Sequence, residues 1–545
     1  MSVCSFLSYG ILPLILLLQR SSAFQGPEGA LTSLPRLLRG RRRLSRPRGG
    51  DFVGVPWGWE GGGKEGLSAG SLSDETAGET VETKGNLLGA SSLVAGTCVG
   101  AGILALPATT IQSGALPSTF ALVVCWAYMV VTGLLLAEGT LRVKREEDLR
   151  GEKRDPEEGL EEGYCSLLTL AERALGPVGA GVSGMAYAFI HYALLIAYVA
   201  VGGKGLADVL HLDSFFGSLA FDVGLGLLLF FGSEPLVETI NSAMVALIVA
   251  SFCGLLFLIG RDVQPDLLLR SDFSSLPPAV PIMFVALVYH NVIPTVCSSL
   301  KGNVGQIQKA ITLGTLLPLV MFVLWNSALL GTVPANAVSP GQNPLALVSE
   351  KVSASEAELV GRVTSVFSEL AIVTSFIGFV YGLTEFFEDF LRSRAYRDDG
   401  KELAEGSEKS IKRRLAFASD RLLSFVVALV PPFLFALGDS SVFFKAIDNA
   451  GTFGISTLFG FIPAAVAWRL RYGELNLTDL DLEEESIGVE EEQAAKRGGG
   501  FFKKWDDLDM VGGGKPFLVL IGAVAVTVIY GETLIKLGLA GGQPG

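Results

Sequence analysis

The chain has 545 residues, half of them hydrophobic, and its mean hydropathy is +0.48. A chain this apolar does not match a soluble globular protein of its length, so we expect a polytopic, all-α integral membrane protein in a lipid bilayer. The net charge of −13 arises from acidic stretches between the apolar runs, including residues 145–163 and 482–493. These stretches read as solvated loops, and we expect no nucleic-acid partner.

The sequence carries no pattern typical of a metal site or an enzyme centre. Its six cysteines are scattered without CxxC spacing, which indicates neither a disulfide framework nor a metal cluster. Its three histidines are dispersed, and it has no HExxH or GxSxG motif, which argues against metal-dependent or nucleophilic catalysis. We therefore predict a protein that is not an enzyme and that holds no metal or other cofactor.

The N-terminus has the composition of a targeting sequence. An apolar core at residues 5–18 is too short to span a bilayer comfortably. Ser21 and Ala23 occupy the small-residue positions of a signal-peptide cleavage site before Phe24. We predict a signal peptide at 1–23, an Arg-rich transit-peptide-like segment at 24–50, a disordered linker at 51–84 and a membrane domain at 85–540.

A signal peptide followed by a transit peptide resembles the bipartite plastid-targeting presequences of algae with secondary, red-lineage plastids. Their motif reads Ala-Phe-x-Pro, and here Ala23 and Phe24 are followed by Pro27, one place later. The resemblance implies the plastid envelope or the thylakoid membrane of an alga. The alternative is an ordinary secretory signal or signal anchor with a basic tail, and thus a plasma membrane or endomembrane location.

Eleven apolar runs follow, each about the 20 residues that a bilayer requires. The fourth run is marginal in length, and the tenth is interrupted by DNAGTFG at residues 448–454. The predicted spans lie at residues 86–111, 115–141, 177–203, 217–233, 237–260, 277–299, 307–333, 362–390, 420–438, 442–468 and 515–538.

The first and sixth spans are interrupted. GTCVGAGILALP at residues 96–107 contains three glycines and ends in Pro107, and both residue types disfavour a continuous helix. YHNVIPTVCSSLKGN in the sixth span has Asn291 and Pro294 near its middle. Interrupted helices at corresponding positions of two halves indicate an inverted-repeat transporter with its binding site at the breaks. The alternative is that the glycines only permit close helix packing.

Such breaks suit an amino acid zwitterion. The positive end of a half-helix, with its unpaired N–H groups, attracts a carboxylate. Carbonyl groups freed at the break accept hydrogen bonds from an ammonium group or bind a coupling cation. Both charges of the substrate are then satisfied without a buried side-chain charge.

Five segments of the apolar region are distinctive: NLLGASSLVAGTCVGAGILALPATTIQSGALPS, LLLAEGTL, YALLIAYVAVGG, VALVYHNVIPTV and AIVTSFIGFVYGL. In these segments the sequence resembles the tyrosine- and tryptophan-specific permeases, the hydroxy and aromatic amino acid permease family of the amino acid–polyamine–organocation superfamily. The resemblance implies a fold like that of the bacterial leucine transporter: a five-plus-five inverted repeat with discontinuous helices 1 and 6, plus one extra C-terminal helix. It also implies symport of an aromatic amino acid with a proton.

Candidate substrate-binding residues come from the two breaks and from the third and eighth spans. Tyr192 and Tyr198 offer a phenol beside an aromatic face, although a tyrosine in a span often only packs or lies at the interface. Resemblance to sodium-coupled relatives puts Thr374 and Ser375 opposite the first break, as polar lining or a vestigial cation site. The predicted set is Gly96, Thr97, Gly100, Ala101, Gly102, Tyr192, His290, Asn291, Thr374 and Ser375.

Three ionisable residues within spans are candidates for proton coupling. Glu138 matches a glutamate of the family pattern near the end of the second span, where it could equally form a structural ion pair. His290 matches a histidine that precedes the Asn and Pro of that pattern. It could titrate, bind substrate, or remain a neutral histidine that satisfies freed backbone. His191 has no counterpart in the pattern and ranks below His290.

We therefore predict a transporter domain at 85–540 that carries tyrosine or tryptophan with a proton by alternating access. The nearest alternative is the same fold coupled to sodium or specific for another amino acid. A channel or other non-transport membrane protein is a weaker alternative, because paired broken helices serve it less well. The sequence does not indicate an oligomeric state.

Overall fold

In a computed structural model of the chain, the described residues all belong to one compact unit, which lies within Phe52–Gly545. They are residues 87–100, 102–150, 166–338, 347–348, 356–398, 407–437, 442–473, 508–537 and 539. The predicted signal peptide, transit-peptide-like segment and linker, together with Ala101, lie outside them.

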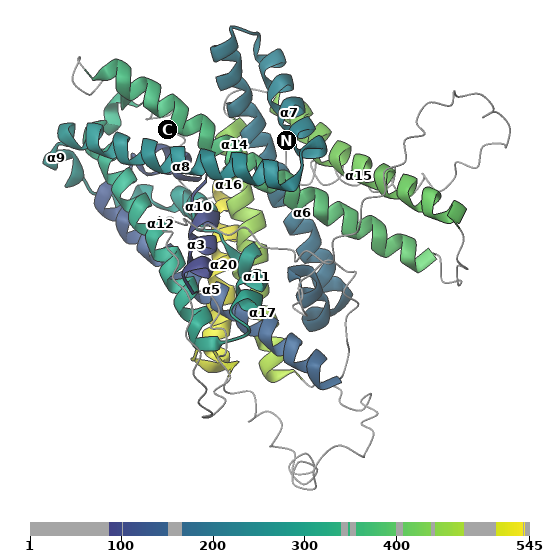
Figure 1. The fold of residues 1–545 in the computed structure, drawn as a ribbon. Coiled ribbons are helices and arrows are strands. Elements are labelled where there is room, and N and C mark those ends of the chain that lie inside the picture. The colour runs from purple at the N-terminus through teal and green to yellow at the C-terminus, as the bar shows by residue number, and fades with distance from the viewer. Residues whose placement is uncertain are drawn as a thin grey trace, which may run out of the picture. The chain divides into compact units, whose positions relative to one another are not determined.

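The described elements are all helical, as the composition predicts (Figure 1). In the first half of the domain they are α3 (Leu87–Cys98), α4 (Gly102–Thr110), α5 (Ala115–Arg150), α6 (Leu167–Leu210), α7 (Ser214–Phe231), α8 (Glu234–Ile259), η5 (Gly260–Asp262), α9 (Pro265–Leu268), η6 (Phe273–Ser275) and η7 (Pro277–Ala279). They continue as α10 (Val280–Ala286), η8 (His290–Val292), α11 (Ile293–Ser299), α12 (Val304–Thr332), η9 (Ala335–Ala337), α14 (Ala357–Asp398), α15 (Ser407–Ala436), α16 (Val442–Asn449), η10 (Ala450–Phe461), α17 (Ile462–Tyr472) and α20 (Gly514–Lys536).

Nine helical segments of the described chain are long and apolar enough to cross a bilayer, and the bent pair α3 and α4 makes a tenth. These ten coincide with ten of the eleven predicted spans. The remaining predicted span, 420–438, corresponds to Arg421–Ala436 of α15. That apolar stretch is shorter than the other candidates, so the helices support nine or ten spans.

The third predicted span differs from the structure at its start. We predicted a span from residue 177, whereas α6 begins at Leu167, with the Ser166 hydroxyl accepting a hydrogen bond from the N–H of Thr169. Gly176 breaks the helical geometry with φ of 71°, and Pro177 restarts it. Positive φ is accessible to glycine at low cost. The stretch 167–175 is therefore a separate helical segment that precedes the span across a kink.

The tenth predicted span is distorted without being interrupted. Residues 450–461 form the π-helix η10 between α16 and α17. The Ser456 hydroxyl donates a hydrogen bond to the carbonyl of Gly451, five residues earlier. A side chain on Gly451 would collide with the backbone of Pro281 in α10. π-helical turns are rare and frequent at functional sites, and this one packs directly against the sixth span.

The sixth and tenth spans lie at the centre of the bundle. In the most apolar windows, 67% of the residues of Pro277–Ser299 and 78% of those of Val442–Tyr472 are buried, against 22% for Thr239–Asp262 and for Gly514–Lys536. Figure 1 shows α3 and α12 next to each other, as their extensive packing requires. Large apolar side chains such as Phe231 on α7, Phe257 on α8 and Leu520 on α20 are exposed. Such surfaces suit contact with lipid.

Candidate functional site

Both predicted helix breaks are present and in direct contact. The first lies between α3 and α4, whose axes bend by 53°. The second lies between α10 and α11 and holds the single-turn helix η8. A Cβ built on Gly102 would lie 2.8 Å from the Cα of Ala286, closer than real side chains permit. The absence of a side chain at Gly102 therefore lets the start of α4 meet the end of α10.

This contact brings together helix ends of opposite polarity. α4 begins at Gly102 and α11 begins at Ile293, while α3 ends at Cys98 and α10 ends at Ala286. The first residues of a helix carry unpaired N–H groups and the last carry unpaired C=O groups. The junction of the two breaks can therefore offer donors to an anion and acceptors to a cation.

The other predicted residues of the first break have different surroundings. The Thr97 hydroxyl donates to the carbonyl of Leu93, 2.8 Å away, so this hydrogen bond stays within α3. Gly96 is half-buried. A Cβ built on Gly100 would lie 2.7 Å from the Oγ of Ser375 in α14. Gly100 and Ser375 are thus direct neighbours, as the resemblance implied for the eighth span.

Ser375 connects the first break to the third span. Its hydroxyl donates to the carbonyl of Ala371, 2.8 Å away, and it is hydrogen-bonded to the buried phenol of Tyr198 in α6. The Thr374 hydroxyl contacts the carbonyl groups of Leu370 and Ala371 at 3.0 and 3.2 Å. Both hydroxyls therefore bond to their own helix, and Ser375 is the one against which Gly100 packs.

Tyr192 has another partner. Its hydroxyl donates to the carbonyl of Val427 in α15 at 2.8 Å, and its ring lies 6.3 Å from that of Phe387. These contacts join α6 to α15 and α14. Of the two tyrosines weighed from the sequence, Tyr198 lies beside the first break and Tyr192 serves a packing contact.

His290 is fully buried at the second break. The hydroxyl of Thr132 donates to the carbonyl of Met129 at 3.1 Å and lies 2.9 Å from His290 Nε2. While the Thr132 hydroxyl donates to Met129, the proton of the ring is on Nε2, which donates to Thr132, and Nδ1 is an acceptor. His290 Nδ1 is buried and has no hydrogen-bond partner in the described structure. The break thus contains a buried ring nitrogen without a partner, while Asn291 beside it is exposed.

Aromatic rings enclose His290. The ring of Phe459 in η10 stacks on it at 4.8 Å, and the Tyr289 ring lies 4.7 Å away. The phenol of Tyr289 donates to the carbonyl of Met129 at 3.1 Å. It lies in the space that a side chain at Gly133 would fill. The second break is therefore fixed against α5 on one side and the π-helix on the other.

His191 lies in a separate aromatic cluster between α6 and α14. Its Nδ1 donates to the carbonyl of Tyr187 at 2.8 Å, because a carbonyl only accepts. Its ring lies 4.0 Å from that of Tyr187 and 4.9 Å from that of Phe379. Phe379 in turn contacts Tyr198 at 5.7 Å. The cluster thereby extends from His191 to the tyrosine beside the first break.

Glu138 is buried in a network of charges. Its Oε1 accepts hydrogen bonds from Arg142 Nε at 3.0 Å and from Arg471 Nε at 2.7 Å. Its Oε2 accepts one from Arg471 Nη2 and one from the backbone N–H of Met510. Arg142 also pairs with Asp509. This arrangement favours the structural ion pair over proton coupling for Glu138, since every carboxylate oxygen has strong donors.

Several buried or half-buried acids within predicted spans were not identified from the sequence, among them Asp222, Glu369 and Glu532. Asp222 in α7 is 3% exposed, and its Oδ1 has no hydrogen-bond partner in the described structure. Glu369 in α14 is half-buried beside an open cavity. Both stand inside runs that were predicted as spans, and an acid within a span is by itself a signal of function. That signal was available in the sequence.

These features define an all-helical integral membrane protein with a built site at two helix breaks. Residues 83–404 match the tryptophan/tyrosine permease family, and the chain belongs to this family. It is accordingly a transporter and not an enzyme, as predicted, and an amino acid substrate is implied by the family.

Individual relatives are distant. The chain is 27% identical over 404 residues to tyrosine-specific transport system 1 of Haemophilus influenzae, covering 72% of this chain and 90% of the relative. It is 27% identical over 328 residues to a tryptophan-specific transport protein of the same species, covering 56% and 74%. It is also 22% identical over 401 residues to glutamine transporter 2 of Aliivibrio fischeri, covering 71% and 90%.

Proposed function

We propose that the protein is a secondary active transporter that carries tyrosine or tryptophan together with a proton. The observation that carries the proposal is the contact between the two breaks at Gly102 and Ala286. Helix ends of both polarities meet there. The chain also belongs to the tryptophan/tyrosine permease family. The substrate carboxylate binds the N–H groups at the start of α4, and its ammonium group binds the carbonyl groups at the end of α3 or α10.

The aromatic side chain of the substrate binds beside the second break. Phe459 and Tyr289 supply ring surfaces there, and aromatic pairs stabilise each other beyond simple burial. The unpaired Nδ1 of His290 accepts a hydrogen bond from the phenol of tyrosine or the indole N–H of tryptophan. A buried acceptor without a donor costs free energy, so this contact favours substrates that bring a donor.

Transport proceeds by alternating access around this site. The fold is a five-plus-five inverted repeat with an additional C-terminal helix, α20, in which the breaks of the first and sixth spans correspond. Gly100, Ser375 and Tyr198 join the first break to α14 and α6. Rocking of the broken helices against these two long helices exposes the site to one face of the membrane and then to the other.

A second substrate class has some support. A relative of similar coverage is a glutamine transporter, and glutamine also has a side-chain donor that His290 could accept. Sodium coupling would use the Ser375 hydroxyl opposite the first break. Aromatic specificity is favoured, because the rings around His290 offer apolar surface that an amide side chain does not use.

Uptake into liposomes that contain the full-length chain tests this function. We expect labelled tyrosine and tryptophan to be taken up saturably and faster when protons flow inward. Unlabelled tyrosine and tryptophan should compete well, and glutamine poorly. Uptake that is unaffected by the pH gradient but requires sodium would overturn proton coupling. Strong competition by glutamine alone would overturn the aromatic specificity.

We also propose that residues 1–50 deliver the protein to a plastid membrane, with cleavage before Phe24. The support is the apolar core at 5–18 followed by the Arg-rich segment at 24–50. A fluorescent protein fused after residue 84 should enter plastids of an alga with secondary plastids. Retention of the fusion at the plasma membrane or in the endomembrane system would contradict this location.

A further inference from the structure

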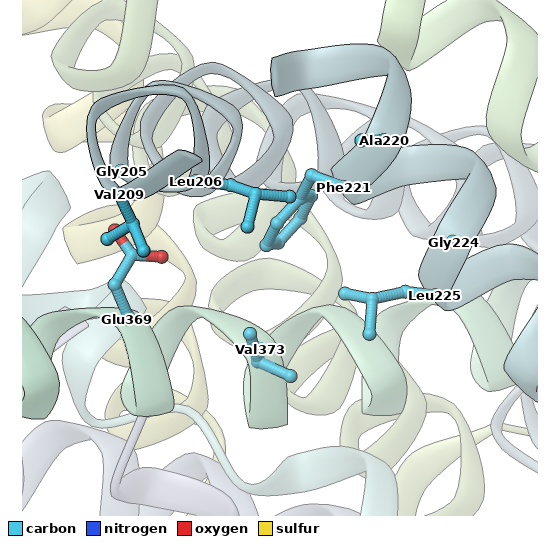
Figure 2. Close-up of a pocket in the computed structure, with 9 residues that line it drawn as sticks. All are labelled: Gly205, Leu206, Val209, Ala220, Phe221, Gly224, Leu225, Glu369 and Val373. Atoms are coloured by element: carbon cyan, nitrogen blue, oxygen red, sulfur yellow. The ribbon is translucent and has the colours of Figure 1, made fainter. Parts of the chain in front are cut away.

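A cavity of about 390 Å³ lies between α6, α7 and α14, apart from the contact of the two breaks. Leu206, Phe221, Leu225 and Val373 make most of its wall apolar, and Glu369 is the one charged residue that lines it. Figure 2 shows the Glu369 side chain rising from α14 toward Gly205 and Val209 of α6, at the edge of this apolar space. The cavity is open on one side, where Val209 and Gly224 are exposed, and it places a carboxyl group beside the apolar side chains of three helices.

Glycine at position 205 makes room for this carboxyl group. A Cβ built on Gly205 would overlap the carboxylate of Glu369. A residue with a side chain at position 205 would therefore displace the flexible end of Glu369. The position of the Glu369 carboxyl group beside α6 thus depends on glycine at this position.

Among the described residues, no positive charge faces Glu369. In the part of the chain that the structure describes, it forms no hydrogen bond or ion pair, and the charge that acts on it is the acid Asp208 of α6. On α7 the buried ionisable group is another acid, Asp222. On α14 itself, Arg362 pairs with Glu358 at 2.6 Å, and Lys204 of α6 is exposed.

An acid in this setting needs a proton or a cation. A carboxylate in apolar surroundings without a compensating charge is costly, and intramembrane acids accordingly mark ion and proton pathways. The cavity is apolar apart from Glu369 and has no second ligand for a metal cation, whereas a proton requires only the carboxylate itself. The chemistry of the hollow therefore favours a proton.

Glu369 also lies near the first break, along helix α14. Ser375 follows it by six residues on α14, which is about 9 Å along a helix, and Ser375 packs against Gly100. Val373, which lines the cavity, lies between them. A change of charge at Glu369 would thus alter the packing of α14 against α6 just beside the element that holds the first break.

We propose that Glu369 is the group that takes up and releases the coupled proton, through the cavity between α6, α7 and α14. The carboxylate accepts a proton from hydronium, which leaves water, and the reverse reaction releases the proton on the other side of the cycle. The neutral acid fits the apolar hollow beneath Gly205, and the carboxylate favours a water-exposed arrangement. This inference rests on the proposed proton symport and names its coupling residue.

The decisive variant is Glu369→Gln in full-length protein reconstituted in liposomes. With one proton per substrate, a gradient of one pH unit supports about tenfold accumulation of tyrosine in the wild type. We expect the variant to exchange labelled for unlabelled tyrosine at equal pH, yet to show no accumulation driven by the gradient. Glu369→Asp should regain part of the accumulation, and Glu358→Gln, an exposed acid on the same helix, should behave as the wild type.

Full accumulation by Glu369→Gln would overturn this inference and leave the proposed function intact. Exchange without any response of the wild type to the gradient would overturn proton coupling itself. If Glu369→Gln does not fold, labelling of the wild type with a hydrophobic carbodiimide, which reacts with protonated carboxyl groups, decides the matter. We expect mass spectrometry to find Glu369 labelled more than Glu358, and less as the pH rises. Equal labelling of the two would refute the assignment.

Discussion

Glu138 and Arg471 form a two-point ion pair between α5 and α17, with Arg471 Nε 2.7 Å from Oε1 and Nη2 2.5 Å from Oε2. The two residues are 333 positions apart in the sequence. Asp509, just before α20, lies within 3.7 Å of Arg471 and pairs with Arg142. The network therefore fixes the ends of two spans and the start of the last helix to one another.

Replacing Glu138 tests whether this network is structural. In Glu138→Gln, two buried guanidinium groups lose their main partner, which we expect to destabilise the fold by about 3 to 5 kcal/mol. The thermal unfolding midpoint of the purified protein should fall clearly, while Glu358→Gln, in an exposed pair, should change it little. Unchanged stability together with lost response to a pH gradient would instead make Glu138 a coupling residue.

A larger residue at Gly102 tests the contact of the breaks. Gly102→Ala brings a methyl group to 2.8 Å from the Cα of Ala286, and such overpacking costs about 1 to 3 kcal/mol. We expect strongly reduced tyrosine exchange in protein that still reaches the membrane. Gly254→Ala on α8, where a Cβ meets open space, is the matched control. Exchange at the wild-type rate by Gly102→Ala would show that the breaks do not need to touch.

His290 is expected to select substrates that carry a side-chain donor. His290→Phe keeps a ring against Phe459 but removes the Nδ1 acceptor. Loss of one hydrogen bond of about 0.5 to 1.5 kcal/mol should weaken competition by tyrosine and tryptophan by roughly two- to tenfold. Competition by phenylalanine, which has no such donor, should stay the same. The exposed His211 provides the control His211→Gln, and an equal loss for all three amino acids would contradict the selection.

Asp272 connects the loop that precedes the sixth span to the end of the first span. Its N–H donates to the carbonyl of Ser113 at 2.8 Å, and its carboxylate accepts hydrogen bonds from the hydroxyls of Ser274 and Ser275. The bond from Ser274, followed by that from Ser275, lowers the pKa of Asp272 below its ordinary value. A lowered pKa stabilises the loop above the ordinary value and loses that effect only as the pH falls through the lowered one.

We therefore expect the amide protons of residues 272–275 to keep constant protection from about pH 5 to 8, after correction for intrinsic exchange rates. Asp272→Ala should lose the protection of the Ser274 amide at every pH, because the carboxylate that accepts a hydrogen bond from this N–H is gone. A decline in wild-type protection already between pH 6 and 5, about two units above the ordinary pKa range of aspartate, would disagree with the lowered pKa.

The helix breaks could be read from the sequence because their causes are local. Glycines weaken the first helix, and Asn291 precedes Pro294 in the first turn of α11, so both breaks were located correctly. Pro107 does not mark the break, because α4 continues through it to Thr110. Glu369 could have been found by the same local reasoning, since it is an acid inside a predicted span. The early start of α6 was missed, because an amphipathic segment before Gly176 lacks the continuous apolar run of a span.

Contacts between distant segments could not be predicted. The sequence around Glu138 does not indicate that Arg471 and Asp509 belong to the same charge network. The choice of Tyr198 over Tyr192 likewise depends on which face of α6 meets α14, a matter of helix phase and tilt that the packing decides. Sequence patterns therefore located the breaks, and tertiary structure decided which side chains surround them.

Counterflow tests the central claim most directly. Liposomes containing the full-length chain are loaded with unlabelled tyrosine, and entry of labelled tyrosine or tryptophan is followed at equal pH on both sides. We predict a saturable, transient accumulation of label that unlabelled tryptophan inside also drives. Absence of counterflow for both amino acids, in protein whose thermal unfolding shows it to be folded, would contradict a transporter of aromatic amino acids.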